Sequence, residues 1–245
     1  MEYKILKDPM SILEISMNKG EILRGDGGAF VFKKGDIDIK TQMREGFFKN
    51  IKVSLLGGES FFVNDFVAKE DNCTLGMSGP PIGDIFQIPI TGDEGYIIQS
   101  GTYIASTSKV ELDTQWQGFT KGLFGSELFM LKATGDGLVF VNAYGSIIKK
   151  TLEAGESMTL DNYHLVALSL NCDYKVTKFG GIKSTILGGE GLVTEIKGPG
   201  TVYFQTKNLK EFIDLFGTPE QQQTSANTLS QVALLGLRFG TGMRY

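Results

Sequence analysis

Two sets of acidic residues recur at corresponding positions along the chain, and they are its most suggestive candidates for chemistry. One set lies between two apolar residues and comprises Asp38, Glu111 and Asp173. The other follows a glycine-containing turn and comprises Glu59, Glu127 and Glu190. Carboxylates that converge on one point can bind a hard cation through their oxygen atoms. A metal site is therefore one hypothesis for these residues.

The spacing favours a structural or interface role for both sets. In a strand, neighbouring side chains point to opposite faces, so an acid between two apolar residues points away from the core. A glutamate after a turn can accept backbone N–H groups or contact the next part of the chain. Ion-pair networks also imitate functional sites. We expect no metal and no cofactor, and we regard the six acids as structural or interface candidates.

Nucleophilic catalysis would depend on His164, the only histidine of the chain. It opens the strand-like segment His164–Ala167 near Asp161, and no nucleophile-elbow sequence accompanies it. We therefore expect a strand-end histidine hydrogen-bonded to a nearby acid. The segment Gly25-Asp26-Gly27-Gly28 lacks the Lys-Ser/Thr of a phosphate loop, which indicates a turn.

Four aromatic residues are candidates for a ligand pocket: Tyr103, Trp116, Phe119 and Phe124. Aromatic residues between strands more often fill a core or a subunit contact. Because the sequence shows no set of residues typical of a catalytic site, we predict that the chain is not an enzyme.

The acids belong to a larger internal repeat. The glycine-containing motifs are Leu56-Gly57-Gly58-Glu59, Phe124-Gly125-Ser126-Glu127 and Leu187-Gly188-Gly189-Glu190. Further landmarks keep the same register, among them Phe32, Ala105 and Ala167. A period of roughly 60 residues predicts three units that bury apolar faces against one another. The expected divisions are residues 1–92, 93–153 and 154–207, with residues 208–245 as a C-terminal helical segment and tail.

Strand signals dominate these units. Short β-branched or aromatic segments bounded by Gly, Asp or Asn predict an all-β fold of sandwiches or barrels. The first unit carries extra residues rich in turn formers, which predicts an exposed loop at about residues 69–81. Helical spacing is found only after Asn208, in the apolar positions of residues 209–216.

The composition excludes several classes of protein. The 245 residues carry a formal net charge of −4, which disfavours nucleic-acid binding because clustered Lys and Arg are needed to contact phosphates. Two cysteines, Cys73 and Cys172, are too few for a disulfide framework. The sequence shows neither a signal peptide nor an apolar run of about 20 residues. A cytoplasmic protein is expected.

Sheet edges predict self-association. A row of three units leaves an unpaired strand edge at either end, and ring closure removes both edges. We expect a homotrimer of nine similar units. A closed monomer with pseudo-threefold symmetry is the alternative.

Several ordered motifs resemble the altered-inheritance-of-mitochondria protein family. They are Gly57-Gly58-Glu59-Ser60-Phe61-Phe62, Gly79-Pro80-Pro81 with Gly83-Asp84-Ile85, residues 99–106, and residues 188–206. The resemblance covers roughly residues 10–210, although Phe32 stands where the family usually has Ala. It implies three β-sandwich or double-stranded β-helix units similar to the tryptophan RNA-binding attenuation protein. It supplies no catalytic residues.

These inferences converge on a non-enzymatic, ring-forming scaffold or binding module. A small-molecule or metal-binding protein, or an enzyme with a cavity between its sheets, is the alternative. RNA binding ranks third because the chain is acidic.

Overall fold

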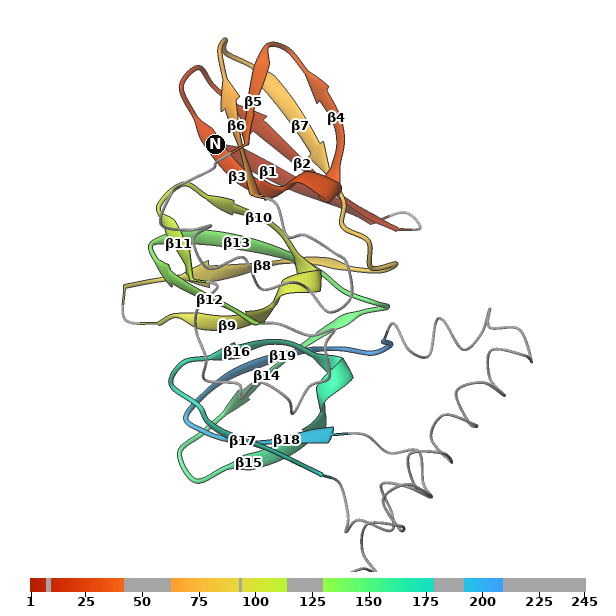
Figure 1. Ribbon diagram of the computed structural model, residues 1–245, viewed down its shortest axis with the longest axis vertical. Coiled ribbons are helices and arrows are strands. Elements are labelled where there is room, and N and C mark those ends of the chain that lie inside the picture. Colours follow the sequence, from red (N-terminus) through yellow and green to blue (C-terminus); the bar gives the residue numbers. More distant parts are fainter. Residues whose placement is uncertain (8–9, 42–62, 93, 114–129, 179–191, 209–245) are drawn as a thin grey trace, which may run out of the picture. The chain divides into compact units, whose positions relative to one another are not determined.

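A computed structural model describes residues 1–7, 10–41, 63–92, 94–113, 130–178 and 192–208, and these residues form an all-β protein (Figure 1). This confirms the predicted fold class. The first seven strands are β1 (Glu2–Lys7), β2 (Ser11–Met17), β3 (Ile22–Asp26), β4 (Phe30–Lys34), β5 (Ile37–Thr41), β6 (Val63–Ala68) and β7 (Cys73–Met77). The next six are β8 (Ile85–Ile90), β9 (Tyr96–Gln99), β10 (Tyr103–Thr107), β11 (Val110–Asp113), β12 (Met130–Gly135) and β13 (Gly137–Asn142). The last six are β14 (Ile147–Leu152), β15 (Ser157–Asp161), β16 (Leu165–Ser169), β17 (Asp173–Lys178), β18 (Leu192–Lys197) and β19 (Gly200–Gln205).

One order of strand pairing occurs three times along the chain. We call β2–β7 the first strand set, β8–β13 the second and β14–β19 the third. In each set the first strand pairs with the last, and the last pairs with the third: β2-β7-β4, β8-β13-β10 and β14-β19-β16. The other three strands form a second group: β3-β6-β5, β9-β12-β11 and β15-β18-β17. A short 3-10 turn carries the chain from one group to the other in every set: Gly27–Ala29, Ser100–Thr102 and Asn162–His164.

Consecutive sets share sheets. β3 of the first set pairs antiparallel with β10 of the second, which makes the six-stranded sheet β5-β6-β3-β10-β13-β8. β9 of the second set pairs in the same way with β16 of the third, which makes the sheet β11-β12-β9-β16-β19-β14. These two joints are visible in Figure 1 as neighbouring strands of different colour. The chain therefore builds sheets that run from one set into the next.

The segment around residues 69–81 corrects one sequence expectation. It contains β7, whose residues Cys73, Leu75 and Met77 are fully buried, in place of the predicted exposed loop. The apolar residues alternate with Thr74 and Gly76, which is the period of a strand. Turn formers on either side hide this short alternation in the sequence. β7 is a central strand, paired with both β2 and β4.

Other predictions from the sequence can be compared with the structure. The strands β9, β13 and β19 are short segments rich in β-branched and aromatic residues, as the sequence predicted. Lys149 and Lys150 lie within β14. The predicted C-terminal helical segment at residues 209–216 lies outside the described residues. Within the described part of the chain, no helix is long and apolar enough to cross a membrane.

Candidate functional site

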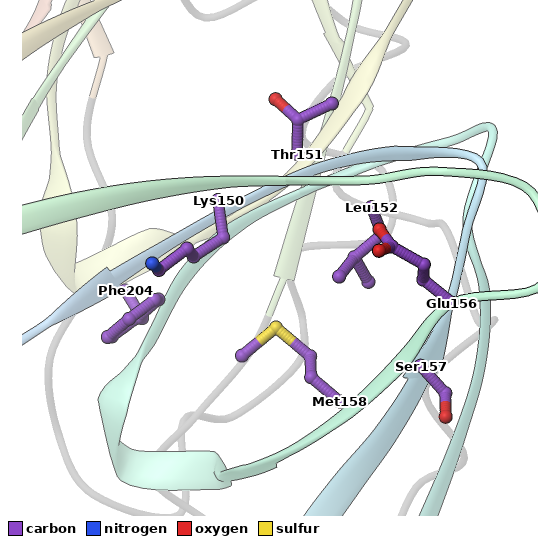
Figure 2. Close-up of a pocket in the computed structure, with 7 residues that line it drawn as sticks. All are labelled: Lys150, Thr151, Leu152, Glu156, Ser157, Met158 and Phe204. Carbon is purple, nitrogen blue, oxygen red and sulfur yellow. The ribbon is translucent and has the colours of Figure 1, made fainter.

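A pocket of about 570 Å³ lies at one side of the third strand set. Its lining comes from β14, from the turn that follows, from β15 and from β19: Lys150, Thr151, Leu152, Glu156, Ser157, Met158 and Phe204. Figure 2 shows the Lys150 and Met158 side chains directed toward Phe204, with Thr151 pointing away from them. Phe204 is held in place because β19 pairs with β14 on one side and with β16 on the other.

The pocket combines an apolar floor with a charged rim. Leu152, Met158 and Phe204 supply the apolar surface, and Lys150 is exposed beside them. The Glu156 carboxylate accepts the backbone N–H of Glu153 at 2.7 Å, so it closes the turn between β14 and β15. The seven lining residues include neither histidine nor cysteine. This arrangement suits the binding of an apolar group better than proton transfer.

His164 has a structural environment rather than a catalytic one. Its Nδ1 lies 2.7 Å from the carbonyl oxygen of Gln205, which can only accept a hydrogen bond. Nδ1 therefore donates, and Nε2 accepts from the side-chain amide of Asn208 at 2.8 Å. The expected acid, Asp161, accepts the backbone N–H of Tyr163. The two ring nitrogens of His164 thus contact a backbone carbonyl and a side-chain amide.

The three acids of the alternating motif are exposed, as predicted, and they lie far apart in the topology. Asp38 is on β5, Glu111 on β11 and Asp173 on β17, and these strands belong to three different sheets. The Lys69 ammonium lies 2.9 Å from Asp38 Oδ2, and this hydrogen bond holds the pKa of the Asp38 carboxyl below its ordinary value. Glu59, Glu127 and Glu190 lie outside the described residues, so their role stays a prediction. Among the described residues no cluster of three or more His, Cys, Asp or Glu could hold a metal ion.

Tyr103 is the described member of the four aromatic pocket candidates, and it belongs to the core. It is 2% exposed, and its hydroxyl lies 3.1 Å from the Arg24 carbonyl oxygen and 3.0 Å from Ser106 Oγ. Burial raises the pKa of this phenol. The Arg24 side chain contacts Asp65 on β6 at 3.3 Å and donates to the Val110 carbonyl oxygen at 3.2 Å. These polar contacts fasten the joint between the first and second sets. Trp116, Phe119 and Phe124 lie outside the described residues.

The shared sheets and the pocket define an all-β protein with no catalytic cluster among the residues described above. The chain belongs to the AIM24 family: the family model described as mitochondrial biogenesis AIM24 matches residues 3–207, which confirms the family predicted from the motifs. An uncharacterized protein of Streptococcus pyogenes serotype M6, M6_Spy0233, is 29% identical over 209 residues, 82% of this chain and 83% of that protein. The crystal structure of protein SPYM3_0169 from Streptococcus pyogenes matches with a TM-score of 0.71 at 26% identity. That match covers 87% of this chain and 97% of the other.

Proposed function

We propose that this protein is a non-enzymatic, ring-forming cytoplasmic scaffold or binding module that assembles as a homotrimer. The order of strand pairing that occurs three times supports a chain of three units, each similar to the unit of the tryptophan RNA-binding attenuation protein. The strand sets differ in their bounds from the units predicted at residues 1–92, 93–153 and 154–207, because β8 and β14 begin the second and third sets. Its working surface is the outer face of the ring, where equivalent features of every unit are displayed repeatedly.

One observation carries the proposal. Strand β3 pairs with β10 of the next set, and its counterpart β9 pairs with β16 of the next set. The third counterpart is β15. Within the described residues β15 pairs only with β18, and β4, the counterpart of β10 and β16, pairs only with β7. β4 and β15 are not paired with each other, so the chain does not close on itself in this structure. Among the described residues, β4 and β15 are therefore the two edges whose counterparts are paired at the joints, and their pairing between copies would give head-to-tail assembly.

Light scattering on the full chain tests the assembly. A homotrimer has three times the 26.8 kDa mass of one chain. A mass of one chain across micromolar concentrations would refute the ring. Affinity purification from the native cell tests the scaffold role. The proposal expects specific partner proteins to be recovered with the assembled form, and recovery of none contradicts a scaffold.

A second candidate is a small-molecule-binding protein that uses the pocket beside Lys150. The combination of an apolar floor with one lysine at the rim favours an apolar molecule that carries an acidic group. A thermal-shift screen with fatty acids and aromatic carboxylates tests it. A Lys150-dependent rise in the melting temperature supports ligand binding, and no response to any compound contradicts it.

A further inference from the structure

We propose that the pocket of the third strand set is a socket for a second copy of this chain. Strand β4 of one copy adds to the edge of β15 of the other, and Val31 and Phe32 of β4 enter the pocket beside Met158. This inference rests on the proposed ring assembly and specifies the surfaces and the register that form it.

The two joints inside the chain supply the register. At the first joint Leu23 lies opposite Thr107, and Gly25 lies opposite Ala105. At the second joint Tyr96 lies opposite Ser169, and Ile98 lies opposite Ala167. The corresponding residues of β15 and β4 follow from the shared pairing of the strand sets. The same register places Leu160 opposite Phe32, Thr159 opposite Lys33 and Met158 opposite Lys34 of the second copy.

Each joint also fills a core across the set boundary. The core cluster of the first set contains four residues from the second set, which are Ile85, Ile104, Ala105 and Phe140. The core cluster of the second set contains the third-set counterparts of the last three, which are Val166, Ala167 and Tyr203. Among the described residues, no further strand set follows the third. The counterparts that would complete its core are Val31, Phe32 and Gly76 of the first set.

At these positions each set pairs one small residue with one aromatic residue, and in the first set the two exchange strands. Ala105 lies directly opposite Phe140, and Ala167 lies directly opposite Tyr203, so a small residue faces an aromatic one. In the first set the order is reversed, and Phe32 lies opposite Gly76. A Cβ atom on Gly76 would overlap the Phe32 ring, which therefore covers the glycine. Phe32 thus provides the aromatic ring that Phe140 and Tyr203 provide at the joints within the chain.

The side chains on β4 and in the pocket are more exposed than the corresponding side chains at the joints within the chain. Val31 is 50% exposed, whereas its counterparts Ile104 and Val166 are fully buried. In the socket, Lys150 is exposed and Met158 is half-buried. Their counterparts in the second set, Ile88 and Tyr96, are 0% and 3% exposed. Val31 on β4, Lys150 on β14 and Met158 on β15 are therefore more exposed than their counterparts at the joints within the chain.

A second copy is the occupant that these observations favour. Donor and socket both derive from this chain, and the two joints within the chain already show the pairing that would connect them. An antiparallel addition also gives hydrogen-bond partners to the edge backbone groups of β4 and β15, which pair with no strand on that side among the described residues.

Cysteine cross-linking tests the register. Residues directly opposite each other in antiparallel strands have Cα atoms about 4.5–5.5 Å apart, which suits a disulfide, whereas diagonal neighbours are farther apart than the usual limit of about 7 Å. A chain with Lys33→Cys and Thr159→Cys should form covalent oligomers under mild oxidation, seen as a ladder on non-reducing gels. The matched control carries Lys33→Cys and Ser157→Cys, which is displaced by two residues. Equal or absent ladders in the two variants overturn the register. The native cysteines are buried and serve as a common background.

A charge substitution tests the contact itself. Val31→Glu places a carboxylate on a residue that is half exposed in the single chain, so folding should be retained. Ile39→Glu is the matched control, because Ile39 is 47% exposed on β5, away from the proposed contact. The concentration for half-assembly should rise at least about tenfold for Val31→Glu, equivalent to about 1.4 kcal/mol, and stay at the wild-type value for Ile39→Glu.

The outcomes distinguish a failure of the ring assembly from a failure of the docking between β4 and β15. A wild-type chain that remains monomeric overturns both the ring and this docking mode. A wild-type oligomer that neither cross-links in the predicted register nor responds to Val31→Glu assembles through another surface, such as the segment at residues 209–245, and overturns the docking mode alone.

Discussion

Gly83 lies where two connecting segments meet backbone to backbone, and Gly83→Ala should destabilise the protein. The residue forms an isolated parallel bridge with Gly145. Asp84 N donates to the Gly145 carbonyl oxygen at 2.7 Å, and Gly145 N donates to the Ile82 carbonyl oxygen at 3.0 Å. A Cβ atom on Gly83 would overlap the backbone of Gly145 and lie 2.5 Å from the Ala143 carbonyl oxygen. All of these are main-chain atoms, so no flexible side chain can move aside.

The magnitude follows from the hydrogen bonds that must break. To admit a methyl group the two segments must separate, which costs the two bonds named above and the bond from Ala143 N to the Asp84 carbonyl oxygen, 2.9 Å long. At about 0.5–1.5 kcal/mol net for each of the three bonds, Gly83→Ala should lower the free energy of unfolding by about 1.5–4.5 kcal/mol. Urea unfolding followed by far-ultraviolet circular dichroism measures this value.

Gly101→Ala is the matched control, because a Cβ atom there has nothing within 4 Å. Its effect should stay within about 0.5 kcal/mol, or be slightly stabilising through the unfolded state. If Gly83→Ala and Gly101→Ala unfold at the same urea concentration, the close approach of the two segments is not a source of stability and the reasoning fails.

Three further predictions concern the side chains of Tyr203 and Cys172, which are buried, and of Tyr174, which is partly buried. Tyr203→Ala should lower the free energy of unfolding by about 3–5 kcal/mol, because the ring is 1% exposed and lies 5.5 Å from the Phe86 ring. Tyr203→Phe keeps the ring and should lower it by only about 1 kcal/mol. Equal losses for the two variants in urea unfolding would contradict this. Burial raises the pKa of Tyr174 to about 12, above the value of about 10 in an unfolded chain. The stability that the neutral Tyr174 phenol contributes should therefore be complete below about pH 10 and be lost as the pH rises toward 12. Absorbance at 295 nm during alkaline titration measures its ionisation. Ionisation of Tyr174 near pH 10 in the folded protein would refute the prediction. Burial raises the pKa of the Cys172 thiol to about 11, so at pH 8 it should react with a disulfide reagent far more slowly in the native protein than in urea, and equal rates would refute that.

The sequence predicted the fold class and the outward direction of the acids, because both depend on local alternation. Asp38, Glu111 and Asp173 each follow a buried residue, and a strand must turn such side chains to solvent. The strand at Cys73–Met77 was missed because its five residues stand among turn formers, and only pairing on both sides with β2 and β4 makes it central.

The pocket was not predicted, although one signal for it is present in the sequence. Lys150 stands where the second set has Ile88, and alignment of the strand sets makes this difference visible once the pairing is known. The partners of His164 were missed for another reason. Gln205 and Asn208 are 41 and 44 residues away in the chain, and only the tertiary fold brings them to the ring.

The short turns that carry the chain between strand groups have a consequence for how the protein can be divided. Because each set lends strands to two sheets, cutting the chain between residues 92 and 93 would strip Ile104, Ala105 and Phe140 from the first core. A fragment ending there would expose both the β3 edge and an apolar cavity, a combination that promotes aggregation. Divisions that look natural in the sequence are therefore poor places for excision, and we expect the described β region to unfold as one cooperative body.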